Sequence, residues 1–169
     1  NSPDPLDLIA KYGADGLRHG IMSIAPKGQD ISFSEERIEQ GRNFCNKLWN
    51  VSRFRLMAAT IEDNSMVELI LLRIQQEVLN DDDQAILLRL VETLDQVEKL
   101  YGEYEFNAVL QTVYRFFWND FCDWYIEASK KRVLDNSSKN TCLAVQDVCL
   151  RHILLLLHPV TPFITEELW

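Results

Sequence analysis

The sequence lacks any long apolar run, and this absence argues against a membrane-spanning helix. In a chain of 169 residues, the longest uninterrupted apolar stretch is Ile153–Leu157, whereas a spanning helix needs about 20 such residues. The first ten residues have neither a basic start nor an apolar centre, so they do not resemble a secretory signal. We therefore expect no membrane partner.

The residues that bind metals or form disulfides are few and poorly spaced. The sequence has four cysteines and three histidines. No two cysteines form a C-x-x-C pair, and the histidines do not complete a zinc spacing with them. The cysteines therefore predict buried, reduced thiols, as in a cytoplasmic protein. They are Cys45, Cys122, Cys142 and Cys149.

Patterns typical of catalysis are also missing. There is no glycine-rich phosphate loop and no Ser/His/Asp arrangement. The neighbouring acids Glu166 and Glu167 lie near an expected helix start, where the helix dipole accounts for them. We expect no chemistry and no cofactor in this chain alone.

Negative charge is in excess, but it is unevenly distributed. The net charge is −9, which by itself argues against a nucleic-acid partner. Residues 57–106 hold twelve Asp or Glu against three Lys or Arg, while residues 1–56 hold seven against eight. Residues 107–169 hold seven against six. The two nearly neutral ends could therefore face a polyanion while the acidic middle faces water.

Helical periodicity dominates the sequence, and strand alternation is nearly absent. Ser2 and Pro3 are typical of a helix start, and Thr161 followed by Pro162 is another. The pattern predicts an all-α, antiparallel helical bundle. The expected helices cover 2–24, Ser32 or Ser34 to about Ala59, 66–79, Asp83–Leu100, Phe106–Val133, 140–157 and a last one from Thr161.

The stretch "RNFCNKLWNVSRF" (42–54) is unusually rich in cations, amides and aromatic rings. At 100° per residue, one side of this helix is apolar or small and is expected to face the bundle. It comprises Ile38, Gly41, Cys45, Leu48, Ser52 and Leu56. The opposite stripe comprises Asn43, Lys47, Asn50 and Phe54, and a shoulder comprises Arg42, Asn46, Trp49 and Arg53.

An aromatic ring beside amides and cations suits single-stranded RNA. The ring stacks on a base, amides hydrogen-bond to base edges, and cations neutralise phosphate. The alternative is a solvated face whose phenylalanine covers a neighbouring helix or loop. The wheel alone leaves both interpretations open.

Other charged residues have simpler interpretations. Asp15 and Arg18 are three residues apart and are expected to form a pair within their helix. The acids Asp120, Asp123 and Glu127 are expected to pair with nearby arginines such as Arg115. The basic run Lys130–Arg132 complements the end of its helix dipole or contacts phosphate. An apolar stripe on the same helix predicts core positions at Val109, Val113, Phe116, Phe117, Phe121 and Trp124.

Four segments, in this order, resemble the region that follows the catalytic core in class I valyl-tRNA synthetases. They are "KYGADGLRHGIMS", "RNFCNKLWNVSRF", "WNDFCDWYIEASK" and "HPVTPFITEELW". Family members usually have a tryptophan near the position of Ala85, which this chain lacks. The resemblance implies an anticodon-binding bundle over 31–169, joined to the catalytic core by a connecting helix and loop over 1–30.

The resemblance also implies roles. Phe54 would stack on an anticodon base, while Asn43, Asn50 and Arg37 would hydrogen-bond to base edges. Phosphate would be held by Arg42, Lys47 and Arg53, with Asn46 beside them. In the first helix, Lys11, Arg18 and Lys27 would be candidates for contacts to the tRNA backbone.

The parent enzyme that this resemblance implies attaches valine to its tRNA with ATP in the cytoplasm. Its ATP would bind in a catalytic domain outside this chain, because Asn1 matches the residue just after the Lys-Met-Ser-Lys-Ser loop. The partners would be valine tRNA and that catalytic domain, and the protein would be a monomer. Two alternatives stay open: the equivalent domain of an isoleucyl- or leucyl-tRNA synthetase, and a helical protein–protein module anchored by its exposed Trp and Phe.

Overall fold

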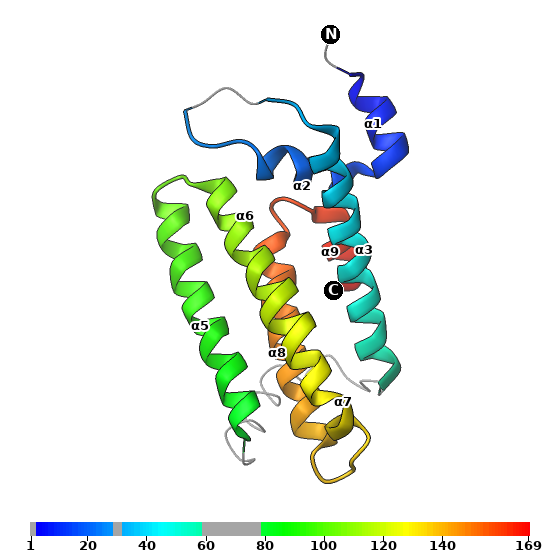
Figure 1. The fold of residues 1–169 in the computed structure, drawn as a ribbon, viewed down its shortest axis with the longest axis vertical. Coiled ribbons are helices and arrows are strands. Elements are labelled where there is room, and N and C mark those ends of the chain that lie inside the picture. The colour runs from blue at the N-terminus through cyan, green and yellow to red at the C-terminus, as the bar shows by residue number, and fades with distance from the viewer. Residues whose placement is uncertain (1–2, 29–31, 59–78) are drawn as a thin grey trace.

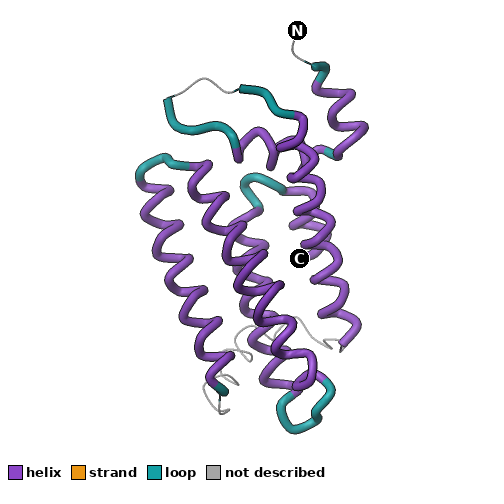
Figure 2. The backbone as a smooth tube through the Cα atoms, in the orientation of Figure 1, coloured by secondary structure: helices purple, strands orange, loops and turns teal. Residues whose placement is uncertain are grey.

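Long helices run side by side along the molecule, and a short helix crosses one end of them (Figure 1). The structure is a computed structural model that describes residues 3–28, 32–58 and 79–169. Its helices are α1 (Pro5–Tyr12), α2 (Ala14–Ser23), α3 (Glu35–Ala58), α5 (Asp81–Gly102), α6 (Phe106–Arg115), the π-helix η1 (Phe116–Ile126), α7 (Glu127–Val133), α8 (Lys139–Leu157) and α9 (Pro162–Leu168). The described residues contain no strand (Figure 2), and the predicted all-α class is confirmed.

Long helices that follow one another in the chain alternate in direction (Figure 1). From the end covered by α2, α3 runs away, α5 returns, the continuous α6–η1–α7 runs away and α8 returns. The helix expected over 66–79 falls almost wholly outside the described residues. The predicted bounds for α8 and for the long helix Phe106–Val133 agree with the structure within about a residue, and α3 begins at Glu35, directly after the later of its two predicted starts. The π-helical segment in the middle of that long helix was not predicted.

The start of the chain differs from its expected single helix. Gly13 has φ 78°, a backbone conformation that side-chain-bearing residues rarely adopt, and it separates α1 from α2. Asp4 caps α1 by accepting a hydrogen bond from the Leu6 N–H at 2.8 Å. The expected cap, Ser2, lies outside the described residues.

The start of α5 follows its sequence directly. The Asn80 side chain accepts a hydrogen bond from the Asp83 N–H at 2.8 Å, and the Asp83 carboxylate accepts one from the Asn80 N–H at 3.3 Å. This capping box satisfies N–H groups that the first turn leaves unpaired. The helix therefore begins at Asp81, two residues earlier than the sequence pattern predicts.

The core lies between α3, α5, η1 and α8. Its largest fully buried side chains include Phe44, Phe116, Phe117, Phe121 and Tyr125. By length and composition α8 could cross a membrane, but 67% of it is buried inside the protein, as in the central helix of a bundle. All four cysteines are buried free thiols, as predicted.

Of the predicted core positions, Trp124 lies at the edge of the core and Leu56 lies outside it. Trp124 is only half-buried, and Tyr125 takes its place, because the π-helical turn shifts which residues face inward. Leu56 is 54% exposed. The end of α3 faces α8 through Arg55, and Leu56 lies about 100° further round the helix, so it points away from the bundle.

Candidate nucleic-acid interface

Helix α3 carries most of the predicted site, and α2 fixes its position. A Cβ atom on Gly41 would lie 2.4 Å from the Gly16 carbonyl oxygen, and one on Gly20 would lie 2.6 Å from the Cα of Ile38. The two backbones are therefore in direct contact, which only glycine permits. This contact sets the side of α3 that faces the bundle and, as a result, the side that faces outward.

The far end of α3 is held by a buried ion pair. Arg55 Nη2 lies 2.6 Å from Asp147 Oδ2 on α8, and the Arg55 side chain is only 5% exposed. Burial raises the pKa of Asp147 more than the neighbouring arginine lowers it. Our sequence reasoning did not single out Arg55. Its spacing of three from Ser52 and seven from Leu48 was the available signal that it lies on the buried side.

The outer face of the second half of α3 is open. Asn46, Asn50 and Arg53 are exposed, and Phe54 is 41% exposed. Trp49 beside them is 39% exposed. Because these residues are three or four apart, they form one continuous surface. The described part of the chain offers Asn46, Asn50 and Arg53 no side-chain hydrogen bond or ion pair, so these groups remain available to a partner.

In the first half of α3 the predicted residues are already engaged. Arg42 Nη2 donates to Glu39 Oε1 at 3.2 Å and to Asn43 Oδ1 at 3.4 Å. The Arg42 guanidinium also lies 5.5 Å from the centre of the Tyr12 ring in α1. A partner would have to displace these contacts to use Arg42.

Arg37 lies apart from the other predicted residues. It donates to Gln40 Oε1 at 3.1 Å on the first turns of α3. Seventeen residues separate it from Phe54, which corresponds to roughly 25 Å along a helix. The structure therefore does not bring Arg37 together with Phe54.

Lys47 is held by two residues of η1. Its ammonium nitrogen lies 2.8 Å from Asp123 Oδ1 and 3.7 Å from the centre of the Trp118 ring. The predicted phosphate contact by Lys47 is thus not favoured by this geometry, since a carboxylate already neutralises the charge. Sequence reasoning missed this contact because Trp118 and Asp123 are distant from Lys47 in the chain.

The charged pair predicted within α2 does not form. The Asp15 carboxylate instead accepts from the Ile164 N–H at 2.6 Å, at the start of α9. Arg18 donates to the carbonyls of Val160 at 2.8 Å and Pro159 at 3.1 Å, beyond the end of α8. The pairing prediction was wrong because unsatisfied backbone groups at two helix ends compete for these side chains.

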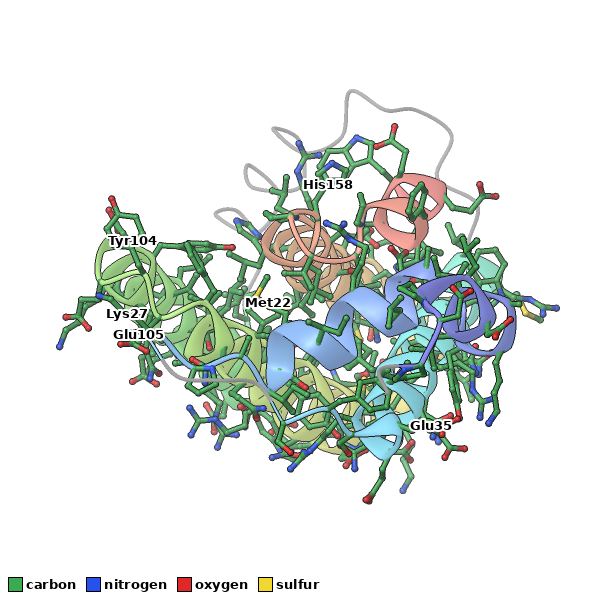
Figure 3. All side chains as sticks on the ribbon, turned by 90° about the horizontal axis from the view of Figure 1, so that it is seen from above. Met22, Lys27, Glu35, Tyr104, Glu105 and His158 are labelled. Carbon is green, nitrogen blue, oxygen red and sulfur yellow. The ribbon has the colours of Figure 1, made fainter. Side chains whose placement is uncertain are left out.

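The other cations proposed for the tRNA backbone are also bound within the protein. Lys11 forms an ion pair with Glu35 at 2.7 Å. Lys27 donates to the Glu103 carbonyl at 2.8 Å, and its ammonium lies 5.8 Å from the Tyr104 ring centre. Figure 3 shows Lys27 beside Tyr104, at the corner between α5 and α6.

The acids of the long helix pair as expected, but with other partners than Arg115. Asp120 pairs with Arg89, Asp123 with Lys47 and Glu127 with Lys130. Pairing across helices is favoured because α3 and α5 flank the helix that carries these acids.

The basic run at the end of α7 is largely used for structure. Arg132 forms two hydrogen bonds of 2.7 Å with the buried Asp83 carboxylate, which also accepts from the Tyr125 hydroxyl at 2.6 Å. Burial alone would raise the pKa of Asp83, but these hydrogen bonds and the Arg132 charge lower it overall. Among the three basic residues, only Lys131 keeps an exposed side chain without an ion pair in the described part of the chain.

Comparison with known families decides what kind of domain this surface belongs to. The profile of the anticodon-binding domain of tRNA ligases matches residues 83–169, just over half of the chain. The chain belongs to this family. In an anticodon-binding domain, a surface that accepts unpaired bases is the expected functional feature. The second half of α3 exposes an aromatic ring beside amides and a cation.

The full length of this anticodon-binding domain is similar to valine–tRNA ligases. The enzyme of Listeria monocytogenes is 42% identical over 171 residues, covering 100% of this chain and 19% of that protein. The Bacillus subtilis enzyme is 42% identical with the same coverage, and the Thermotoga maritima enzyme is 43% identical over 169 residues, 18% of its length. The chain therefore spans about a fifth of the curated relatives it matches.

Solved structures share the fold at lower identity. Mycobacterium tuberculosis methionyl-tRNA synthetase in complex with methionyl-adenylate matches with a TM-score of 0.75 and 24% identity, over 98% of this chain and 33% of that one. The leucyl-tRNA synthetase of Agrobacterium radiobacter K84, in a ternary complex with tRNA, matches with a TM-score of 0.68 and 20% identity, over 99% and 19%. These likenesses support the helical fold of the family.

Proposed function

We propose that the chain recognises the anticodon loop of valine tRNA through the outer face of α3. The observation that carries this proposal is the exposed Phe54 within one turn of Asn50 and Arg53, three groups that the rest of the described chain leaves available. Full-length similarity to valine–tRNA ligases supports valine tRNA as the partner.

Each exposed residue suits one part of an unpaired nucleotide. The Phe54 ring stacks on a base, the amides of Asn46 and Asn50 hydrogen-bond to base edges, and Arg53 neutralises phosphate. Asn43 and Arg42 extend this surface once their mutual hydrogen bond is exchanged for contacts to RNA. Arg37 takes part only if the RNA reaches the first turn of α3.

The setting of the domain follows from its relatives. We propose that it serves in a monomeric, cytoplasmic valine–tRNA ligase, whose catalytic domain binds ATP and attaches valine to the tRNA. Residues 1–30 connect the bundle to that catalytic domain. The hydrogen bond of Asp15 to the start of α9, and that of Arg18 to the turn between α8 and α9, hold this connection against the bundle.

The test measures binding of the chain to valine tRNA and to the same tRNA with a replaced anticodon. Stacking on one aromatic ring contributes about 1–3 kcal/mol, so Phe54→Ala should weaken binding to valine tRNA by about 5- to 150-fold. Phe33→Ala is the matched control, because Phe33 is similarly exposed (46%) but lies outside α3. A Phe54→Ala change smaller than about twofold would show that this ring does not stack on a base.

The same assay separates the alternatives. A domain of the isoleucine or leucine type would prefer tRNA carrying those anticodons. A protein–protein module would bind neither tRNA, or would bind both without preference. Binding that favours the valine anticodon and weakens as salt rises supports the proposed function.

A further inference from the structure

The π-helix η1 holds a cation from each helix that flanks it. On one side, Trp118 and Asp123 hold Lys47 of α3. On the other, Asp120 pairs with Arg89 of α5, and the Arg89 guanidinium lies 4.8 Å from the centre of the Trp124 ring. We name these the Lys47 clamp (Trp118 and Asp123) and the Arg89 clamp (Asp120 and Trp124).

The π-helical turn makes the Lys47 clamp possible. In an α-helix, two residues five apart differ in direction by about 140°, so they would not meet one ammonium group. The wider turn of a π-helix brings residues five apart closer to the same face. Trp118 and Asp123 are five apart, and both contact the Lys47 nitrogen.

The clamp is backed by a column of stacked rings. Trp118 stacks on Tyr114 with centroids 5.4 Å apart, and Tyr114 stacks on Phe44 at 5.6 Å. Phe44 stacks in turn on His19 at 4.6 Å. Trp118 is therefore engaged within the protein, by stacking on Tyr114 and by contact with the Lys47 ammonium.

We propose that the Lys47 clamp turns Lys47 into a fixed hydrogen-bond donor for a base edge, and not a phosphate contact. Asp123 neutralises the positive charge, so the attraction to phosphate is largely lost. One of three N–H donors is directed to Asp123, and the Lys47 side chain remains 22% exposed. By helical spacing, Lys47 lies on the same stripe of α3 as Asn43 and Asn50, whose amides suit base edges. The acceptor would be a carbonyl oxygen or ring nitrogen of an unpaired base.

Holding the ammonium in advance also lowers the entropy that binding must remove. Trp118 and Asp123 are therefore positioning residues for Lys47. This inference rests on the proposed function, because it assumes that an RNA loop lies on the outer face of α3.

The test combines anticodon discrimination with the salt dependence of binding, over about 50–200 mM salt. Lys47→Gln should reduce the preference for valine tRNA over the replaced anticodon several-fold, without changing the salt slope. Asp123→Asn releases the ammonium to bind phosphate. It should reduce the preference and steepen the salt slope by about 0.7, the value for one more phosphate contact on a single strand.

Asp120→Asn is the matched control, because it releases Arg89 on the α5 side of η1, away from α3 (Figure 1). It should change neither the anticodon preference nor the salt slope. Thermal unfolding of each variant shows whether it folds. If Asp123→Asn does not fold, Lys47→Gln alone tests the inference. A lower preference for the valine anticodon with an unchanged salt slope is expected only if Lys47 contacts a base.

Two results overturn the inference while the proposed function stands. One is a shallower salt slope with unchanged discrimination in Lys47→Gln, which identifies a phosphate contact. The other is unchanged slope and discrimination in a folded Asp123→Asn. A wild-type chain without any anticodon preference would overturn the proposed function, and this inference with it.

Discussion

Both faces of α3 include apolar and polar side chains, although the inner face is the more apolar. The inner face includes Ser52 and Arg55 as well as Phe44 and Leu48, and all four are buried. The outer face includes the apolar Phe54 beside amides and cations. The polarity of a single residue therefore does not by itself assign it to one face or the other.

What separates the two faces is whether they pack inside the protein. On the inner face, Gly41 lies against the Gly16 backbone and Arg55 against Asp147. On the outer face, Asn50 and Arg53 have no side-chain partner among the described residues. Changes on the inner face should therefore alter folding stability, and changes on the outer face should alter RNA binding.

The largest expected effect is a loss of folding stability at low pH, caused by His19, which packs against the inner face of α3. His19 stacks on Phe44 and is buried, and burial lowers its pKa from 6.5 to about 4. The unfolded chain therefore binds a proton at a higher pH than the folded chain does. The free energy of unfolding should have its full value above pH 6.5. Below that pH it should fall by roughly 1.4 kcal/mol per pH unit, down to about pH 4.

Chemical denaturation at several pH values measures this effect, by comparing the free energy of unfolding of the wild type with that of His19→Phe. His19→Phe keeps a ring against Phe44 but has no titrating group, so it should lack this part of the slope. Equal slopes in wild type and His19→Phe would show that His19 is not the residue responsible.

The next largest effect tests the contact between α2 and α3. In Gly41→Ala the new methyl group would lie 2.4 Å from the Gly16 carbonyl oxygen, and neither backbone can move without separating the helices. The free energy of unfolding should fall by about 2–3 kcal/mol. Thermal or urea unfolding of the chain gives the value.

Gly102→Ala is the control for this change. Gly102 ends α5, and a Cβ there would meet no atom within 4 Å. Alanine at this position should be neutral or stabilise by up to about 1 kcal/mol, because it restricts the unfolded chain. Similar losses in both variants would mean that the contact with Gly16 is not the cause.

The smallest expected effect is a change in the salt dependence of RNA binding, tested by replacing two arginines of α3 in turn. Arg53 is exposed without an ion pair among the described residues, whereas Arg42 is paired with Glu39. Arg53→Gln should reduce the salt slope of tRNA binding by about 0.7, as expected for one lost phosphate contact. Arg42→Gln should reduce the salt slope by less. The reverse order would place the phosphate backbone near the first half of α3.

Much of this architecture could be predicted because it depends on local patterns. The bounds of α3 and α8, the buried cysteines and the outward position of Phe54 all follow from helical periodicity and capping residues. The division of α1 from α2 was missed, because Gly13 in an otherwise helical pattern does not reveal its φ angle.

Pairing between distant charges was the least predictable feature. Sequence spacing assigned Asp15 to Arg18 and the acids of the long helix to Arg115. The structure gives Asp15, Asp120 and Asp123 partners on other elements, and it pairs Glu127 with Lys130 in its own helix. Spacing within one helix shows which local pairs are possible. It does not reveal the cations and helix ends of other elements that come into contact with these acids after folding.

The sequence by itself determined the class of the protein, an all-α bundle, and the helix that presents the amide and aromatic stripe. Those properties depend on residues within a few turns of one another. Only the tertiary structure decided which members of the stripe and its shoulder remain exposed, since Lys47 and Arg42 are engaged within the protein while Asn50, Arg53 and Phe54 are exposed. The physical reason is that availability depends on contacts from α1 and η1, which lie far from α3 in the chain and meet it only after folding.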